Sequence, residues 1–310
     1  MVTTEKIATV IGGGVIGASW AALFLGHGMK VVICDPAPKI AETATPQITA
    51  ALEELKTMGL PVPVGPPQLA FEPVLSQAVA SADIIQENGP EKKDFKQHLW
   101  VDVEKHCKPE ALLLSSSSGI PASEQSLLMS LPERLVIGHP FTPPHIMPLV
   151  EVVPGSARNE GTIKKVIAFY EGLGKTVVVL RKEITSFVGN RLQSALFREA
   201  VYLVREGVVS VDELDRVVTA SLGIRWAVAG PFKSFHMGGG PGGLQHFLDT
   251  LGASMERLWP HLGTASFDDP TKKLLMEQAN ASFASINYDV LTSARDKKEI
   301  AMVCLLKDVE

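Results

Sequence analysis

Gly12-Gly13-Gly14-Val15-Ile16-Gly17 is the stretch that decides the fold, because of the segments on either side of it. The apolar residues 6–11 predict a buried strand before the stretch, and residues 14–27 predict a helix after it. The first glycine permits a tight turn, the third lets a phosphate approach the backbone, and the last lets helix and strand pack closely. The stretch therefore predicts the opening strand–turn–helix unit of a dinucleotide-binding domain.

Asp35 strengthens this interpretation, because glycines alone could form a turn that binds nothing. It follows the next predicted strand, residues 30–34, and lies 18 residues beyond Gly17. A carboxylate at that place accepts hydrogen bonds from the ribose hydroxyls and repels a 2′-phosphate. Pro36 follows it and no arginine is adjacent. The predicted cofactor is therefore NAD rather than NADP.

The rest of the first half alternates strand-like and helix-like segments, which predicts a parallel sheet covered by helices. A helix is expected over residues 40–58, where Pro46 could interrupt it, and residues 61–67 are proline-rich and read as an ordered loop. Further strands are expected at residues 83–85, 112–114, 135–137, 149–153 and 176–180.

Helical patterns replace strands from about Ser186 onward. They cover residues 192–205, 243–259 and 271 to the end, and Ser210-Val211-Asp212-Glu213 reads as a capping box that starts another helix. We therefore predict an α/β fold with a Rossmann-type dinucleotide-binding domain over residues 1–184. An all-α C-terminal domain, for substrate binding and dimerisation, is predicted over residues 185–310.

Composition and charge exclude several classes of protein. Of the 310 residues, 45% are hydrophobic and 20% charged, as in a folded enzyme rather than a disordered chain. The net charge of −5 gives no broad positive field for nucleic acid or an anionic membrane. Three scattered cysteines are too few for a disulfide framework or a zinc ribbon, so no metal is predicted. Without a secretory pattern or a membrane-length apolar run, a cytoplasmic location is expected.

A histidine and a glutamate stand out in two successive apolar runs. His139 follows the strand predicted at residues 135–137, and Glu151 lies 12 residues later within another apolar run. A carboxylate buried alone in such a strand is unfavourable, and its simplest partner is His139. The carboxylate would hold the imidazole in one tautomer and make it a better base. A structural histidine is the alternative; His145, in a proline-bracketed loop, is not expected to take part.

Longer motifs extend the pattern over nearly the whole chain, which resembles the L-3-hydroxyacyl-CoA dehydrogenase superfamily. The motifs are Gln86-Glu87-Asn88-Gly89-Pro90-Glu91, Ser115 to Ser118, His139-Pro140-Phe141, Leu149-Val150-Glu151-Val152-Val153-Pro154 and Phe187-Val188-Gly189-Asn190-Arg191-Leu192. Gly223-Ile224-Arg225-Trp226-Ala227 resembles the branch that contains lambda-crystallin (L-gulonate 3-dehydrogenase) and L-carnitine dehydrogenase.

The resemblance implies NAD-dependent oxidation of the 3-hydroxyl of a small L-3-hydroxy acid, gulonate- or carnitine-like, with His139 as base and Glu151 assisting it. It implies that Ser118 contacts the substrate and that Asn190 helps to hold the substrate oxygen. It also places Glu91 and Lys96 on the cofactor side, and it implies a homodimer formed through the helical domain. Capping roles are the alternatives for the serines and for Asn190.

The choice of substrate depends on charge. Only Lys39 and Lys56 stand among seven acidic residues from Pro36 through Glu91, with Glu91 included, where the larger family has a helical excursion that binds CoA. This favours a small free acid over a CoA ester, whose phosphates usually meet lysine or arginine. Arg225 is the candidate for the substrate carboxylate, although an interdomain or capping role is equally open.

Two aromatic residues are candidates for the substrate pocket. Phe141 and Trp226 could line it, where aromatic rings suit a quaternary ammonium group, or they could be packing residues.

Three other functions compete with this prediction. They are an L-3-hydroxyacyl-CoA dehydrogenase, a β-hydroxyacid dehydrogenase with a lysine base, and a catalytically silent crystallin-like or NAD-binding protein. The lysine base is disfavoured because Asn190 and Arg191 occupy the matching segment.

Overall fold

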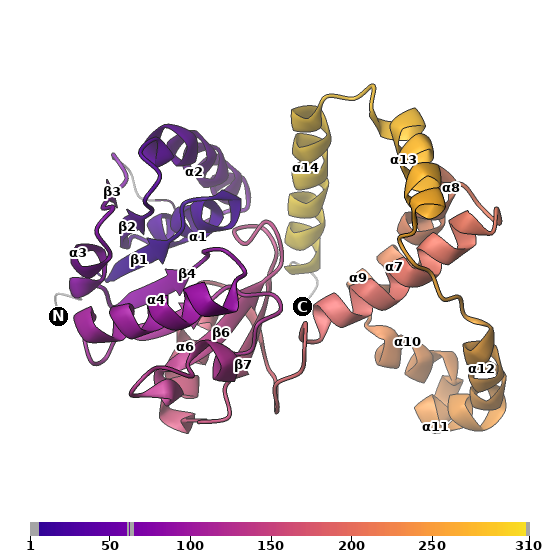
Figure 1. Ribbon diagram of the computed structural model, residues 1–310. Coiled ribbons are helices and arrows are strands. Elements are labelled where there is room, and N and C mark those ends of the chain that lie inside the picture. The colour runs from indigo at the N-terminus through magenta and orange to yellow at the C-terminus, as the bar shows by residue number, and fades with distance from the viewer. Residues whose placement is uncertain (1–5, 61, 63–64, 308–310) are drawn as a thin grey trace. The chain divides into compact units, whose positions relative to one another are not determined.

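The computed structural model describes residues 6–60, 62 and 65–307. The first half of the chain is built on one sheet (Figure 1). The eight strands in these described residues are hydrogen-bonded in the order β3-β2-β1-β4-β5-β6-β7-β8. Their bounds are β1 Ile7–Ile11, β2 Lys30–Cys34, β3 Leu69–Phe71, β4 Ile84–Glu87, β5 Leu112–Ser115, β6 Leu135–Pro140, β7 Leu149–Pro154 and β8 Thr176–Val179.

The sheet is mixed, so the predicted parallel sheet is wrong at its far edge. Strands β1 to β6 pair in parallel, β7 runs antiparallel to β6, and β8 is parallel to β7. The reason is the connection between Pro140 and Leu149, which holds eight residues. A parallel crossover needs about a dozen residues or more, so the chain turns back as a hairpin.

Helices cover both faces of this sheet and form a core on each. One face carries α1 Val15–Gly26, α2 Ile40–Thr57 and α6 Glu160–Gly172; the other carries α3 Leu75–Ala80, α4 Lys93–His106 and α5 Ala122–Gln125. Helix α1 is apolar all round because it is buried between its neighbours. Its Trp20 lies 5.6 Å from Tyr170 of α6, measured between ring centroids. This packing fixes the start of α1, and therefore the glycine turn, against the sheet.

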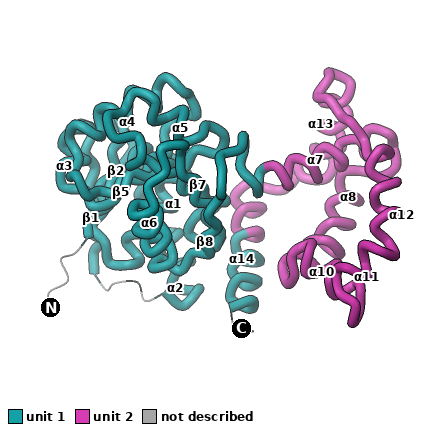
Figure 2. Tube along the Cα trace, turned by 90° about the horizontal axis from the view of Figure 1, so that it is seen from below, with its two compact units in different colours: residues 1–190, 296–310 teal, residues 191–295 magenta. Residues whose placement is uncertain are grey.

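The chain divides into two compact units between Asn190 and Arg191, and the residues from Asp296 onward cluster with the first unit (Figure 2). The predicted domain boundary at residue 184 stays a prediction. After the sheet come α7 Gly189–Arg205, α8 Val211–Val217, a π-helical turn Val218–Leu222, α9 Gly223–Val228, α10 Pro231–Gly238, α11 Gly243–Phe247, a second π-helical turn Leu248–Gly252, α12 Ala253–Leu258, α13 Asp269–Phe283 and α14 Tyr288–Lys307.

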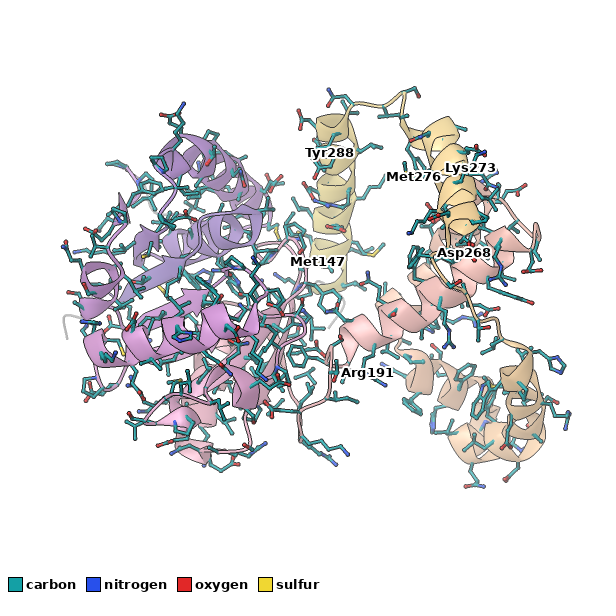
Figure 3. All side chains as sticks on the ribbon, viewed as in Figure 1. Met147, Arg191, Asp268, Lys273, Met276 and Tyr288 are labelled. Carbon is teal, nitrogen blue, oxygen red and sulfur yellow. The ribbon has the colours of Figure 1, made fainter. Side chains whose placement is uncertain are left out.

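A local sequence pattern in the helical half correctly predicted where a helix begins. Ser210 and Glu213 form the predicted capping box at the start of α8. Asp268, which is labelled in Figure 3, precedes α13 and caps it. Its side chain accepts a hydrogen bond from the backbone N–H of Thr271 at 2.9 Å. In the first half, α2 continues through Pro46 without the predicted interruption. Strand β3 was not predicted, because three residues are too short to show a period.

The structure does not describe the first five residues, the last three, or positions 61, 63 and 64. The ordered loop predicted over residues 61–67 therefore lies partly outside the described residues. Among the described residues, every helix is too short or too polar to cross a membrane.

We predict that Gly17→Ala destabilises the fold by about 3 kcal/mol, as overpacking of a rigid site does. A Cβ atom at Gly17 would lie 1.9 Å from the carbonyl oxygen of Gly12, and both atoms are held by backbone that cannot yield. Gly14→Ala is the matched control, since nothing lies within 4 Å of its Cβ position. Urea unfolding of both variants measures the difference, and equal midpoints for the two would contradict the prediction.

Candidate active site

The glycine turn lies between β1 and β4, where the strand order reverses and open α/β sheets bind their ligands. Gly12 has φ +88° and donates its N–H to the carbonyl of Cys34 at 2.8 Å. The first turn of α1 has no side-chain cap and no acidic residue, and space is open beside Gly14. Free N–H groups at a helix N-terminus with room in front of them fit a pyrophosphate.

Asp35 lies beside this turn, at the end of β2. Its Oδ2 accepts a hydrogen bond from the N–H of Gly13 at 2.8 Å, and its Oδ1 accepts one from Ala37 at 2.9 Å. The carboxylate is only partly buried, and each oxygen keeps lone pairs for a further donor. The residues present therefore fit the adenosine ribose of a dinucleotide.

His139 and Glu151 are direct partners across β6 and β7. Opposite residues of an antiparallel pair project on the same face of the sheet, so this register brings the two side chains together. His139 Nδ1 lies 2.8 Å from Glu151 Oε2, and the residues are 4% and 2% exposed. The carboxylate accepts from Nδ1–H in this arrangement, which leaves Nε2 as the free basic nitrogen.

The second oxygen of Glu151 is held by the backbone that leads into α7. Oε1 accepts hydrogen bonds from the N–H groups of Val188 at 2.9 Å and Gly189 at 3.1 Å. Burial alone would raise the pKa of Glu151, but the hydrogen bonds from His139, Gly189 and Val188 outweigh it and the pKa is lowered. The carboxylate therefore stays charged beside the imidazole.

Two aromatic rings flank His139, and sequence reasoning identified only one of them. Phe141 and Phe187 lie 5.5 and 5.4 Å from the imidazole, measured between centroids. Phe141 packs so closely on Gly189 that a Cβ atom there would lie 2.3 Å from the ring. Phe187 is fully buried at φ +52°, a left-handed conformation that aromatic residues rarely adopt. No local sequence signal marks Phe187, because its position depends on this unusual backbone.

Glu91 organises the turn that carries Ser118. Its Oε1 accepts hydrogen bonds from Ser117 Oγ at 2.5 Å and from the N–H groups of Gly119 at 2.9 Å and Ile120 at 3.2 Å. Burial would raise the pKa of Glu91, but these hydrogen bonds and the nearby Lys96 ammonium lower it. The turn is thus fixed by a charged carboxylate.

Ser118 and Asn190 are brought together at this turn. The Asn190 side-chain amide donates to the backbone carbonyl of Ser118 at 3.4 Å. The Ser118 side chain is exposed, so its hydroxyl is accessible to a ligand. The substrate contacts of both residues stay a prediction.

Lys96 lies deeper than its predicted place on the cofactor side. It is 1% exposed, and its ammonium lies 2.6 Å from Glu87 and 3.5 Å from Glu91. Glu87 is fully buried and also accepts from Ser115 Oγ at 2.6 Å. Lys96 therefore supports Glu91 from inside the fold, and its contact with the cofactor stays a prediction. The sequence motif contained Glu87, but gave no sign of this role.

Arg225 and Trp226 lie on α9 in the second compact unit. Both are exposed, Trp226 by 40%. Their predicted contacts with a substrate carboxylate and a substrate cation stay predictions.

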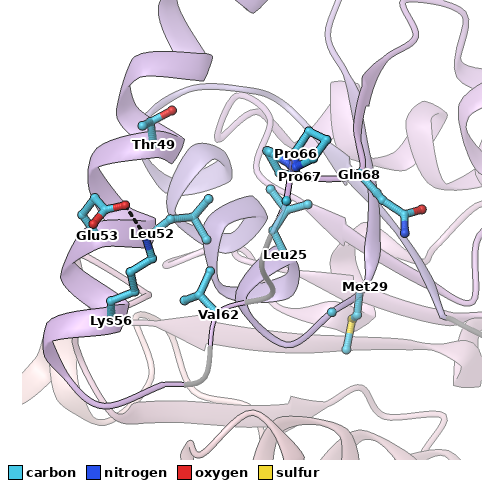
Figure 4. A pocket seen from close by; sticks show the side chains of 12 residues that line it. Leu25, Met29, Thr49, Leu52, Glu53, Lys56, Val62, Pro66, Pro67 and Gln68 are labelled. Atoms are coloured by element: carbon cyan, nitrogen blue, oxygen red, sulfur yellow. Dashed lines mark hydrogen bonds and ion pairs between the residues drawn. The ribbon is translucent and has the colours of Figure 1, made fainter.

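A pocket of about 450 Å³ lies at the opposite end of α1 from Gly14 (Figure 4). It is lined by Leu25, Gly28, Met29, Thr49, Leu52, Glu53, Lys56, Val62, Gly65, Pro66, Pro67 and Gln68, none of which is a predicted site residue. Its two charged residues, Glu53 and Lys56, already pair at 2.5 Å. The described part of the chain holds no group of three or more potential metal ligands.

Comparison with known proteins identifies the family of the chain. The family model "3-hydroxyacyl-CoA dehydrogenase, NAD binding domain" matches residues 7–184, and "3-hydroxyacyl-CoA dehydrogenase, C-terminal domain" matches residues 187–268. The chain belongs to the 3-hydroxyacyl-CoA dehydrogenase family. The predicted family, the Rossmann-type fold with a helical C-terminal domain, and NAD as cofactor are confirmed. The predicted class, an NAD-dependent 3-hydroxy acid dehydrogenase, is confirmed with them.

Relatives within this dehydrogenase family cover nearly the whole chain. The L-carnitine dehydrogenase of Nocardiopsis dassonvillei is 36% identical, over 99% of this chain and 94% of the relative. That of Oceanobacillus iheyensis is 34% identical, over 98% and 99%. Among solved structures, an NAD⁺-dependent dismutase, 5-formyl-3-hydroxy-2-methylpyridine 4-carboxylic acid 5-dehydrogenase, has a TM-score of 0.84. It is 28% identical and the match covers 98% of this chain and 99% of that one.

We predict that Glu151 stabilises the dehydrogenase fold at neutral pH and loses this effect in acid. Because its folded-state pKa is lowered, the contribution is complete above the unfolded value of about 4.3 and disappears as pH falls through the folded value. Glu151→Gln should therefore cost about 2 kcal/mol at pH 7 and progressively less below about pH 4. Urea unfolding across this range measures it, with exposed Glu110→Gln as control. A cost that is the same at every pH would contradict the assignment.

Proposed function

We propose that the chain oxidises the 3-hydroxyl of a small L-3-hydroxy acid to the 3-keto acid, and that the substrate is carnitine-like rather than gulonate-like. The observation that carries the proposal is the buried His139–Glu151 pair, which leaves one imidazole nitrogen free at the same edge of the sheet as the dinucleotide-binding turn. The full-length relatives named L-carnitine dehydrogenase support the choice of substrate.

His139 acts as the general base at its Nε2. Oxidation of a secondary alcohol requires the hydroxyl proton to leave together with the hydride, and Nε2 accepts that proton. Glu151 stabilises the imidazolium that forms, and its lowered pKa keeps the proton on the histidine. NAD, when bound at the glycine turn and Asp35, supplies the hydride acceptor.

Ser118 and Asn190 position the substrate oxygen. Both are polar, and one hydrogen bond already ties the Asn190 amide to the backbone of Ser118. Glu91 fixes the turn that carries Ser118 through three donors, so the oxygen would meet a prearranged site. Lys96 and Glu87 support Glu91 from inside the fold.

A free acid suits this chain better than a CoA ester. A CoA moiety carries several phosphate charges that cations normally balance. Lys56 is already paired with Glu53 on α2, which leaves Lys39 alone among the described lysines between Pro36 and Glu91. The family name keeps a 3-hydroxyacyl-CoA as the competing substrate.

Aromatic rings favour a cationic substrate. Phe141 lies next to His139 and is partly exposed, and Trp226 is exposed on α9. Aromatic faces attract a quaternary ammonium group, which carnitine has and gulonate lacks. Arg225 stays our candidate for the substrate carboxylate.

We predict NAD reduction with L-carnitine and weaker or no reduction with L-gulonate, L-3-hydroxybutyrate and 3-hydroxybutyryl-CoA. The measurement is the ratio of kcat/KM values from absorbance at saturating NAD, because this ratio reports discrimination between substrates. Preference for the CoA ester would overturn the substrate. NADH binding without turnover of any substrate would favour the silent, crystallin-like alternative.

We also propose a homodimer formed through the helical half. Its large apolar side chains are unusually exposed: Phe197 by 55%, Phe232 by 77%, Trp259 by 60% and Met276 by 62%. Sedimentation equilibrium at micromolar concentration should give twice the chain mass; the mass of one chain would contradict the proposal.

The location of the enzyme stays a prediction. The three cysteines are unpaired, as expected in a reducing compartment such as the cytoplasm. Measurement of the protein in isolated cell fractions would test this location.

A further inference from the structure

A second pocket in the first unit contains none of the predicted catalytic residues. Its volume is about 180 Å³. Its walls come from the C-terminal ends of α1 and α2, the loop between β6 and β7, the turn before β8 and the last turns of α14. Apolar side chains line most of it: Leu23, Leu55, Met58, Leu60, Ile146, Pro148, Leu173 and Val303. The remaining side chains are basic, namely His27, His145, Lys175 and Lys307, and none of the described lining residues is acidic.

Lys175 is the buried cation of this pocket. It is only 7% exposed, and its ammonium donates to the backbone carbonyls of Pro144 and of Met147, the latter at 2.9 Å. The ammonium also lies 5.7 Å from the centroid of the Trp20 ring. Among the described residues, no carboxylate lies within ion-pair distance of it. A buried charge without a counter-ion is costly, so an anion here would be stabilised.

The basic groups of the pocket repel one another. Burial, together with a smaller effect of the nearby Lys307 charge, lowers the pKa of Lys175 to about 7. The charge of Lys175 in turn helps to lower the pKa values of His27 and His145, after the larger effect of burial. Each effect places one of these groups near Lys175, and because both histidines are shifted toward the neutral form, the positive field of the pocket comes from Lys307 and Lys175.

The acidic side chains near the pocket do not neutralise this field at Lys175. Glu54 is hydrogen-bonded to His145, with Oε2 2.6 Å from Nε2, and the other ring nitrogen lies 2.7 Å from Ser19 Oγ. Asp296 acts on the charge of His145 as well. Glu54 is therefore paired with the histidine, and His145, which sequence analysis had set aside, anchors the pocket wall to α1.

The shape of the pocket sets the size of a ligand. A volume near 180 Å³ corresponds to about six water molecules at roughly 30 Å³ each, and so to a ligand of about six non-hydrogen atoms. One end of such a ligand would meet the basic groups, and the rest would pack on leucine side chains.

We propose that this pocket binds a short aliphatic monocarboxylate of about the size of butyrate, with its carboxylate at Lys175 and Lys307. The site is independent of the proposed oxidation, because it shares no residue with the glycine turn or with the His139–Glu151 pair. Lys175 and His145 hold the loop between β6 and β7, so an occupied pocket would touch the connection between the two catalytic strands.

The test is a butyrate titration of the full-length protein without NAD, followed by NMR of labelled leucine and valine methyl groups. We expect a Kd of about 1 mM, which is reasonable for so small a ligand, and shifts at Leu55, Leu173 and Val303. Butanol and butylammonium, with the same chain and no negative charge, should bind at least about tenfold more weakly.

Charge reversal at the rim makes the test specific. Lys307 is exposed, so Lys307→Glu should keep the fold and weaken butyrate binding at least about tenfold. Lys298→Glu is the matched control, because Lys298 is an exposed lysine of α14 that does not line the pocket, and it should change the Kd less than about twofold. Both variants should keep wild-type turnover.

Four results would overturn the proposal: no butyrate binding to the wild type, equal binding of butanol, equal weakening by both lysine variants, or methyl shifts confined to residues beside the glycine turn such as Val15. The last result would assign butyrate to the active site. Failure of the L-carnitine assay would leave the titration unaffected, so the two proposals are tested separately.

Discussion

One carboxylate, that of Glu151, connects three parts of the first unit. It sits opposite His139 in the antiparallel register of β6 and β7, and its second oxygen accepts the N–H groups of Val188 and Gly189 at the start of α7. Both oxygens are therefore used, and these bonds keep the group charged despite burial. The orientation of the imidazole follows, because Nδ1 is committed to the carboxylate and Nε2 is left for chemistry.

The same physical solution appears a second time on the other side of the site. Glu87 and Lys96 are both buried, and they pair inside the fold, while Glu91 extends from this pair to the turn before Ile120. Burying these charges is costly, and the cost is offset only because each has charged or backbone partners. In both clusters a carboxylate fixes backbone amides, and that fixed backbone carries Asn190 in one cluster and Ser118 in the other.

Much of the fold could be predicted because its signals are local. The glycine turn, the period of each strand and the capping box at Ser210 depend on residues close in sequence. The antiparallel direction of β7 could have been predicted too, since eight residues are too few for a crossover. Phe187 could not, because its contact with His139 depends on left-handed backbone. Lys96 was assigned by resemblance, which gave its neighbourhood but not its depth.

The most direct test of the account is a double-mutant cycle on turnover with His139→Ala, Glu151→Gln and the double variant. We expect His139→Ala to lower kcat by about 10³-fold while NADH affinity is unchanged, as for loss of a general base. Adding Glu151→Gln to that variant should cost little more, since the carboxylate acts through the imidazole. Full turnover in His139→Ala, or losses that multiply independently, would contradict the account.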